Sequence, residues 1–300
     1  MHKMELDIDL SGRSFLITGA ARGLGASYGD MLCSRGAHVM INDIDAAAAQ
    51  EKAGDLRERG YTALSNCSDI TTWDGAQEAV ARTDEAFGRL DGLICNAGFL
   101  RDRSFHKMTR DEMDSILRVH LMGAIYPTHA AWPIMRDAGF GRVVLTASTS
   151  SLWGNFGQAN YDAAKGGLCG FMGALKLEGK KYNVQINTIA PLAATRLSTD
   201  LFKTQEFPDM PPEQIAGLVS YLCSPACELN GEILEAGGGY VSRATMMRSG
   251  GVVADLSRPE NVGSAIRELL TQTPAQSFLD AHQSITDILR RLLVPAEKKK

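Results

Sequence analysis

The chain has 300 residues, of which 44% are hydrophobic and 22% are charged, and its formal net charge is −4 at pH 7. This composition is that of an ordinary globular protein near the upper size of one domain, and the negative charge does not favour nucleic-acid binding. No apolar run is long enough for a membrane span, and the N-terminus carries no apolar stretch for a secretory signal. We therefore expect a cytoplasmic protein with reduced cysteines.

The first unit is a short apolar segment, residues 13–18, followed by a glycine-rich turn and then by helical periodicity. Gly19, Gly23 and Gly25 form the turn. Such a turn between a strand and a helix can cradle a phosphate, because backbone N–H groups and the positive end of the helix face the anion and glycine permits close approach. The spacing differs from the usual G-x-G-x-x-G, so a plain tight turn is the alternative.

The next strand is predicted over residues 37–42 and ends at Asp43. An acidic residue about 20 positions past the glycine turn can bind the ribose hydroxyls of an adenosine and would repel a 2′-phosphate. Arg22 has the opposite effect, because a cation in the glycine turn can contact that phosphate. We give Asp43 more weight, since a carboxylate beside a phosphate is the costlier conflict, and expect NAD rather than NADP.

Helical and strand-like segments then alternate along the chain. Further strands are predicted at residues 62–65, 93–95, 142–147, 183–189 and 232–235, helices at 45–59, 73–87 and 212–223, and helical material within 108–135. Repeated β–α units predict a parallel sheet with helices on both faces, and right-handed crossovers bring the strand ends to one edge, where ligands bind. The residues that follow predicted strands are Gly19, Asp43, Asp69, Asn96, Ser148 and Pro191.

Tyr161 and Lys165 lie four residues apart and would share one face of a helix. A free tyrosine has a pKa of about 10, and a nearby cation can lower it by roughly 1–3 units, so that the phenol can take a proton from an alcohol near neutral pH. Ser148 could hold the same oxygen by a hydrogen bond. Taken alone, the pair is more often an ordinary exposed helical pair, so its meaning depends on the other motifs.

Three further segments predict assembly or substrate access. Segment 158–180 carries many glycines and alanines, and this small-residue face indicates close helix packing at the interface of a homodimer or homotetramer. Segment 199–212 is either a lid over an apolar substrate or a surface loop. Residues 246–300 form a helical extension, with helices near 259–270 and 275–293, that docks on its own body or on a neighbouring subunit. Cys223 and Cys227 have no histidine nearby, so we expect no metal site.

Together these motifs make the chain resemble the short-chain dehydrogenase/reductase family over residues 10–245. The motifs are Thr18-Gly19-x-x-x-Gly23-x-Gly25, Asp69, Asn96-Ala97-Gly98, Ser148, Tyr161-x-x-x-Lys165 and Pro191. The resemblance implies a Rossmann-like, doubly wound parallel sheet of seven strands in residues 1–245, a nicotinamide cofactor, and hydride transfer at an alcohol or ketone carbon. It implies that Tyr161 is the acid/base, that Lys165 holds the nicotinamide ribose and lowers the tyrosine pKa, and that Ser148 orients the substrate oxygen.

The resemblance also implies a set of cofactor-binding residues along the glycine turn and the strand ends. These are Gly19, Arg22, Gly23, Leu24, Gly25, Asp43, Asp69, Ile70, Asn96, Ala97, Gly98, Tyr161, Lys165, Pro191 and Thr195.

A closer likeness is to the (3R)-hydroxyacyl-CoA dehydrogenase unit of peroxisomal multifunctional enzyme type 2, in residues 100–105, 119–121, 154–161 and 187–191. His120 stands where most family members have a catalytic-network asparagine, and we include it among the catalytic residues. Cys95 and residues 192–194 also depart from the family pattern.

The likeness implies a hydroxy or keto substrate, most of all a 3-hydroxyacyl-CoA. Arg101, Arg103, Lys107 and Arg196 could bind the CoA phosphates, or they could be solvated or ion-paired surface charges. A hydroxysteroid substrate is the alternative, and a protein that senses NAD without turnover is the remote one.

Overall fold

The computed structural model describes residues 7–193 and 210–293. The chain divides into two compact units, Met1–Arg243 and Ala244–Lys300. Thr195, Arg196 and most of the 199–212 segment lie outside the described residues.

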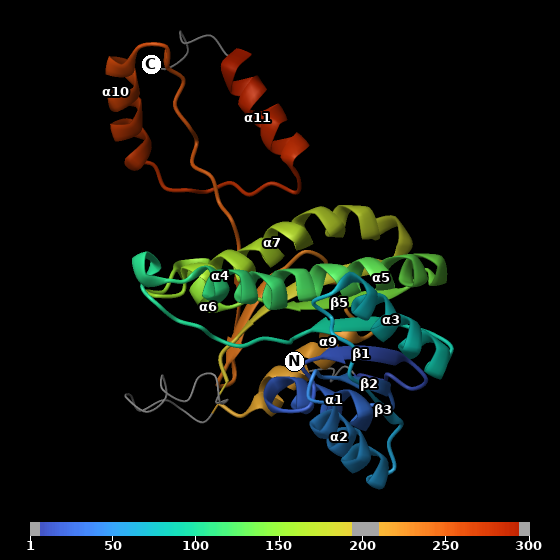
Figure 1. Cartoon of the computed structure of the whole chain (residues 1–300). Helices are drawn as coiled ribbons and strands as arrows, with labels where there is room; N and C mark the ends of the chain where they lie inside the picture. The colour runs from blue at the N-terminus through green and yellow to red at the C-terminus, as the bar shows by residue number, and fades with distance from the viewer. Residues whose placement is uncertain (1–6, 194–209, 294–300) are drawn as a thin grey trace. The chain divides into compact units, whose positions relative to one another are not determined.

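The first unit is built on a single sheet (Figure 1). Its strands are β1 (Ser14–Thr18), β2 (His38–Asn42), β3 (Ala63–Asn66), β4 (Gly92–Cys95), β5 (Gly141–Thr146), β6 (Val184–Pro191), β7 (Ile233–Gly237) and β8 (Tyr240–Ala244). They lie in the order β3-β2-β1-β4-β5-β6-β7-β8, and β1 to β7 pair in parallel. The predicted parallel α/β arrangement is therefore confirmed, and the carboxyl ends of the parallel strands meet at one edge.

Helices cover both faces of this sheet (Figure 1). The helices are α1 (Gly23–Ser34), α2 (Ala46–Glu58), α3 (Trp73–Phe87), α4 (Arg110–Leu117), α5 (Gly123–Ala138), α6 (Thr149–Trp153), α7 (Ala159–Gly179) and α9 (Pro212–Cys223). Two apolar clusters lie between the helices and the sheet. In one, α1, α2 and α9 pack on one face of the strands; in the other, α3, α5 and α7 pack on the opposite face. The strands between the clusters are almost continuously buried, as expected where helices cover a parallel sheet on both sides.

The predicted count of seven strands is one short, because β8 joins the sheet beside β7. Gly238 and Gly239 connect the two strands, and both have positive φ, 57° and 81°. That pair of conformations is typical of a two-residue hairpin turn, which glycine adopts without steric cost. Periodicity did not reveal β8 because Tyr240 and Val241 are exposed, so the strand lacks a buried apolar run.

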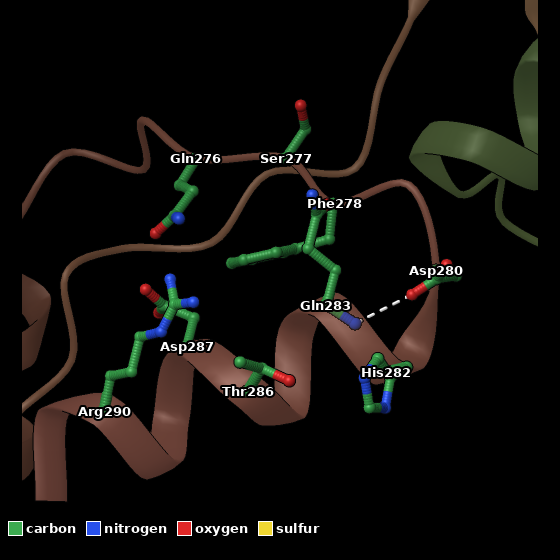
Figure 2. A pocket seen from close by; sticks show the side chains of 9 residues that line it. All are labelled: Gln276, Ser277, Phe278, Asp280, His282, Gln283, Thr286, Asp287 and Arg290. Atoms are coloured by element: carbon green, nitrogen blue, oxygen red, sulfur yellow. Dashed lines mark hydrogen bonds between the residues drawn. The ribbon is translucent and has the colours of Figure 1, made fainter. Parts of the chain in front are cut away.

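The second unit contains α10 (Pro259–Leu270) and α11 (Ala281–Leu293). α11 begins six residues later than predicted, because the Asp280 carboxylate accepts the Gln283 N–H at 2.7 Å and so caps the helix there. Asp287 on this helix forms ion pairs with Arg248 and Arg291. Figure 2 shows a hollow along α11, and none of the predicted site residues lines it. Among the described helices, none has the length and apolarity needed to cross a bilayer.

Candidate active site

The glycine turn after β1 is packed on one side and open on the other. A Cβ on Gly19 would lie 2.6 Å from Cα of Ala97, and one on Gly25 would lie 2.3 Å from the Gly19 carbonyl oxygen. Gly23, in contrast, has φ +59° and no atom within 4 Å of where a Cβ would stand. The open backbone at Gly23 and the helix start next to it form the cradle that a pyrophosphate requires.

The N-terminus of α1 is also left available for an anion. Arg22 is the N-cap, its side chain makes no capping hydrogen bond, and the first turn contains no acidic residue. The first N–H groups of a helix have no partner within the helix, and the helix dipole makes this end positive. The turn therefore fits the pyrophosphate of a nicotinamide dinucleotide, with Gly19, Gly23, Leu24 and Gly25 around it.

Asn96 fixes the position of this turn from the neighbouring strand. Its amide Nδ2 donates to the carbonyl oxygens of Gly19 at 3.0 Å and Thr18 at 3.2 Å. In return the Thr18 hydroxyl accepts the N–H groups of Asn96 and Ala97 at 3.1 and 3.2 Å. Asn96 thus positions the glycine turn directly, and Thr18 is a site residue that we had placed only within the motif.

Asp43 lies beside the same turn. Its Oδ2 accepts the Ala21 N–H at 3.2 Å and its Oδ1 accepts the Asp45 N–H at 3.1 Å. Arg22 points to α2, where its guanidinium pairs with the Asp45 carboxylate at 2.8 Å. Asp43 and Arg22, which we expected to have opposite effects on a 2′-phosphate, therefore both lie at this edge. Arg22 already has a partner, the Asp45 carboxylate.

Asp69 and Ile70 follow β3 and form the turn into α3. The Asp69 carboxylate accepts the Thr71 N–H and hydroxyl at 2.9 and 2.7 Å. Ile70 is buried, and its Cδ1 would lie 2.5 Å from a Cβ on Gly123 at the start of α5. Both residues shape the strand end.

The catalytic candidates lie at the ends of β5 and α7. Ser148 follows β5 and caps α6, with its Oγ accepting the Ser150 N–H at 3.3 Å. Tyr161 is in the first turn of α7, and its phenol is close enough to Ser148 for that side chain to lower the pKa of the phenol. Lys165 is one turn further on, with its Nζ 5.7 Å from the centroid of the Tyr161 ring.

Burial dominates the acidity of this group. It raises the pKa of Tyr161, which outweighs the lowering by the Ser148 hydrogen bond. It also lowers the pKa of Lys165 to about 7, and the Nζ of Lys165 donates to the carbonyl oxygen of Thr146. The pKa of Tyr161 is therefore raised where we expected it to be lowered, because burial of the phenol disfavours its charged form.

His120 completes the group and lies against the Tyr161 ring. It lies in a π-helical turn, Arg118–Met122, within the stretch 108–135 where helical material was predicted, and such turns are frequent at functional sites. Its ring contacts Tyr161 edge-on at 5.0 Å between centroids, and a Cβ on Gly98 would lie 2.1 Å from its Cε1. Gly98 therefore has no side chain because the imidazole occupies that space.

The protonation of His120 is fixed by its surroundings. Burial, with a contribution from Lys165, lowers its pKa to about 3, so the ring is neutral at physiological pH. Its Nε2 lies 2.7 Å from the carbonyl oxygen and 3.1 Å from the N–H nitrogen of Phe99. Its Nδ1 is buried and has no hydrogen-bond partner among the described residues. That nitrogen is available to a water or ligand group in the site.

Asn160 was missed at the sequence level and holds the start of α7. It is 1% exposed, and its Nδ2 donates to the carbonyl oxygens of Glu112 at 2.9 Å and Arg101 at 3.3 Å. Its Oδ1 accepts the N–H of Tyr161 at 2.8 Å. An asparagine next to a catalytic candidate carries no signal in periodicity or spacing, so only the structure identifies this role.

The structure thus brings the predicted residues into one chain of contacts. Gly19 meets Ala97, Gly98 meets His120, and His120 meets Tyr161. Pro191 ends β6, the strand beside β5, and Thr195 lies outside the described residues.

Of the cations proposed to bind a CoA ester, two form ion pairs with carboxylates. Arg101 pairs with Asp111 and Arg103 with Glu112, as the surface alternative predicted. Lys107 is exposed and forms no ion pair among the described residues. Arg196 lies outside them.

Comparison with known proteins identifies the family to which the chain belongs. Residues 13–206 match the family model of the short chain dehydrogenases, so the chain belongs to that family. It is 40% identical, over 83% of its length and 90% of the other, to a protein of Mycobacterium tuberculosis described as a short-chain type dehydrogenase/reductase. It is 32% identical, over 94% of its length and 95% of the other, to the hydroxyacyl-CoA dehydrogenase ChsB1 of the same organism.

The expected likeness to the multifunctional enzyme is also confirmed. The solved structure of full-length peroxisomal multifunctional enzyme type 2 from Drosophila melanogaster superimposes with a TM-score of 0.76 at 30% identity, over 95% of this chain and 50% of that one. The chain spans 28% to 65% of the length of its peroxisomal multifunctional relatives. The chain is therefore an oxidoreductase that acts on CH–OH groups.

The buried lysine makes a testable prediction about stability. With its pKa about 7 in the folded protein and about 10.5 in the unfolded chain, Lys165 binds more protons when unfolded between those pH values. Stability therefore rises with pH in this window. We expect wild type to gain roughly 3 kcal/mol relative to Lys165→Met between pH 7 and 10. Urea unfolding of both proteins measures this, and parallel pH profiles would contradict the burial of the ammonium.

Proposed function

We propose that the chain is an NAD-dependent dehydrogenase that interconverts a secondary alcohol and a ketone, with a 3-hydroxyacyl-CoA as the preferred substrate. The observation that carries the proposal is the arrangement of Tyr161. Ser148 lowers the pKa of its phenol, the Lys165 ammonium lies near its ring, and the His120 ring contacts it edge-on, on the same strand edge as a glycine turn that fits a dinucleotide.

A nicotinamide dinucleotide held at the glycine turn would supply the acceptor for a hydride from the alcohol carbon. Tyr161 takes the hydroxyl proton as the ketone forms, and returns it in the reverse direction. Ser148 donates a hydrogen bond to the same substrate oxygen and orients it. Lys165 holds the nicotinamide ribose and, once protonated, lowers the pKa of the phenol. His120 stays neutral, and its ring keeps Tyr161 in place.

The preference for NAD rests on Asp43. Its carboxylate lies beside the glycine turn and is held by two backbone N–H groups, so its negative charge is fixed where an adenosine ribose would bind. A 2′-phosphate at that place would meet an anion without a neutralising partner, which is unfavourable.

The preference for a CoA ester rests on the names of relatives and on the exposed cation Lys107. Two relatives are named hydroxyacyl-CoA dehydrogenase and acetoacetyl-CoA reductase. Lys107 is exposed and could meet a CoA phosphate. A hydroxysteroid is favoured instead by the exposed rings of Phe105 and Phe156, whose loops are joined by a 2.8 Å bond between the Arg103 N–H and the Gly157 carbonyl.

A substrate panel tests the proposed function. Purified protein with NAD is given (3R)- and (3S)-hydroxyacyl-CoA thioesters of several lengths and a set of hydroxysteroids, and NADH formation is followed by absorbance. We expect turnover of one hydroxyacyl-CoA stereoisomer. Turnover of steroids alone would favour the alternative, and binding of NAD without any turnover would favour a sensing protein.

The role of Tyr161 is tested with Tyr161→Phe. We expect this variant to lose at least about 10³-fold in kcat while keeping its affinity for NADH, because only the proton transfer is removed. Tyr182→Phe, at a tyrosine outside the site, is the matched control and should keep its activity. Unchanged turnover of Tyr161→Phe would rule out the assigned base.

We also propose that α7 forms a subunit interface in a homodimer or homotetramer. Gly170 and Gly173 have no atom within 4 Å of a Cβ position, so a second helix could approach this face. Gly170→Leu should shift the protein to monomers in sedimentation velocity, whereas Gly54→Leu on α2 should not. A wild-type monomer at micromolar concentration would contradict the interface.

We propose a cytoplasmic location as well. All six cysteines are free thiols, which is typical of proteins in a reducing compartment.

A further inference from the structure

The edge of the glycine turn carries an ion pair that the family motifs do not include. Arg22 has an extended backbone, with φ −146° and ψ 167°, and its guanidinium reaches the first turn of α2. There it meets the Asp45 carboxylate at 2.8 Å, with the two side chains 50% and 41% exposed. Asp45 was not singled out in the sequence, because it stands before an alanine run and resembles an ordinary helix cap.

Asp45 is held firmly while it makes this pair. Its Oδ1 accepts the Ala48 N–H at 3.1 Å as the N-cap of α2, which leaves Oδ2 for the guanidinium. Its own N–H donates to Asp43 at 3.1 Å, and Asp43 accepts the Ala21 N–H at 3.2 Å. A closed ring of contacts therefore runs from Arg22 through Asp45 and Asp43 back to the glycine turn.

This ring has a direct consequence for dinucleotide choice. A guanidinium binds phosphate oxygens well and would attract a 2′-phosphate if it were free. Here the Asp45 carboxylate already pairs with the Arg22 guanidinium. A second carboxylate, that of Asp43, lies where the adenosine ribose is proposed to bind. An exposed ion pair is weak, so the pair alone would not resist a phosphate, but breaking it leaves the Asp45 charge without a partner and close to the incoming anion.

We propose that Asp45 is a specificity-determining residue that makes the site reject NADP by holding Arg22 in an ion pair. The inference rests on the proposed NAD-dependent function. It holds that the preference for NAD over NADP depends on Arg22 and Asp45 as well as on Asp43. Asp43 repels the 2′-phosphate, and Asp45 withholds the cation that would otherwise compensate for this repulsion.

The test substitutions separate the charge of Asp45 from its capping role. Asp45→Asn removes the charge, and asparagine caps a helix as well as aspartate does. Asp45→Ser is a second variant that also keeps a cap, and far-UV circular dichroism checks that both fold. Dissociation constants of NADH and NADPH are measured by the fluorescence of the reduced cofactor, so that the readout does not depend on turnover.

We expect Asp45→Asn to tighten NADPH binding about fivefold or more, which is the effect of one charge at contact distance in water, and to change NADH binding less than about twofold. This gain in NADPH affinity should depend on the Arg22 guanidinium. In the Arg22→Ala background, Asp45→Asn should therefore leave the ratio of NADPH to NADH affinity nearly unchanged. Asp55→Asn, which removes a carboxylate from another surface ion pair of α2, is the matched control and should have no effect.

Three outcomes would overturn the inference, and they are distinguishable. An unchanged ratio in Asp45→Asn and Asp45→Ser, with NADH still bound tightly, would overturn the role of Asp45 and leave the dehydrogenase proposal intact. If Asp45→Asn still tightens NADPH binding in the Arg22→Ala background, the Asp45 charge itself repels the phosphate and its ion pair with Arg22 is not the cause. A wild-type protein that binds neither dinucleotide would overturn both this inference and the proposed function.

Discussion

The site depends on a buried ammonium. Lys165 is 3% exposed and lies against the end of β5, where its Nζ donates to one backbone carbonyl, that of Thr146. Removing an ammonium from water costs several kcal/mol unless partners replace the lost solvation, and one carbonyl replaces only part of it. A cost of this kind is tolerated where the charge has a use, which makes strongly shifted groups a guide to active sites.

The surrounding packing converts this buried charge into a defined geometry. His120 fills the space above Gly98 and contacts the Tyr161 ring, while Asn160 ties the start of α7 to the Glu112 carbonyl. On the other side, Asn96 bonds the glycine turn to β4. Because Asn96 and Gly98 are two residues apart, the same strand end positions both the dinucleotide cradle and the catalytic group.

Much of this arrangement follows from local sequence. Glycine spacing and alternating apolar segments predicted the parallel sheet, since those patterns are set by backbone conformation and burial. They did not predict β8, which is exposed, or the π-helical turn at His120, whose sequence fits an ordinary helix. Nor did they predict the hydrogen bonds of Asn160 and Asp45, because a polar residue's partners depend on tertiary contacts. The prediction for the Tyr161 pKa was wrong in direction for the same reason: helical spacing shows that Lys165 is near but not that the phenol itself is buried.

The most direct test of this account is the acidity of the Tyr161 phenol. Phenolate absorbance, measured as the difference between wild type and Tyr161→Phe across pH, reports it in the free protein and with saturating NAD. The account predicts a pKa above the ordinary tyrosine value in the free protein, because the phenol is buried, and a lower pKa when ribose hydroxyls accept Lys165 and keep its ammonium protonated. A phenol pKa that does not change on NAD binding would contradict the proposed role of the buried lysine.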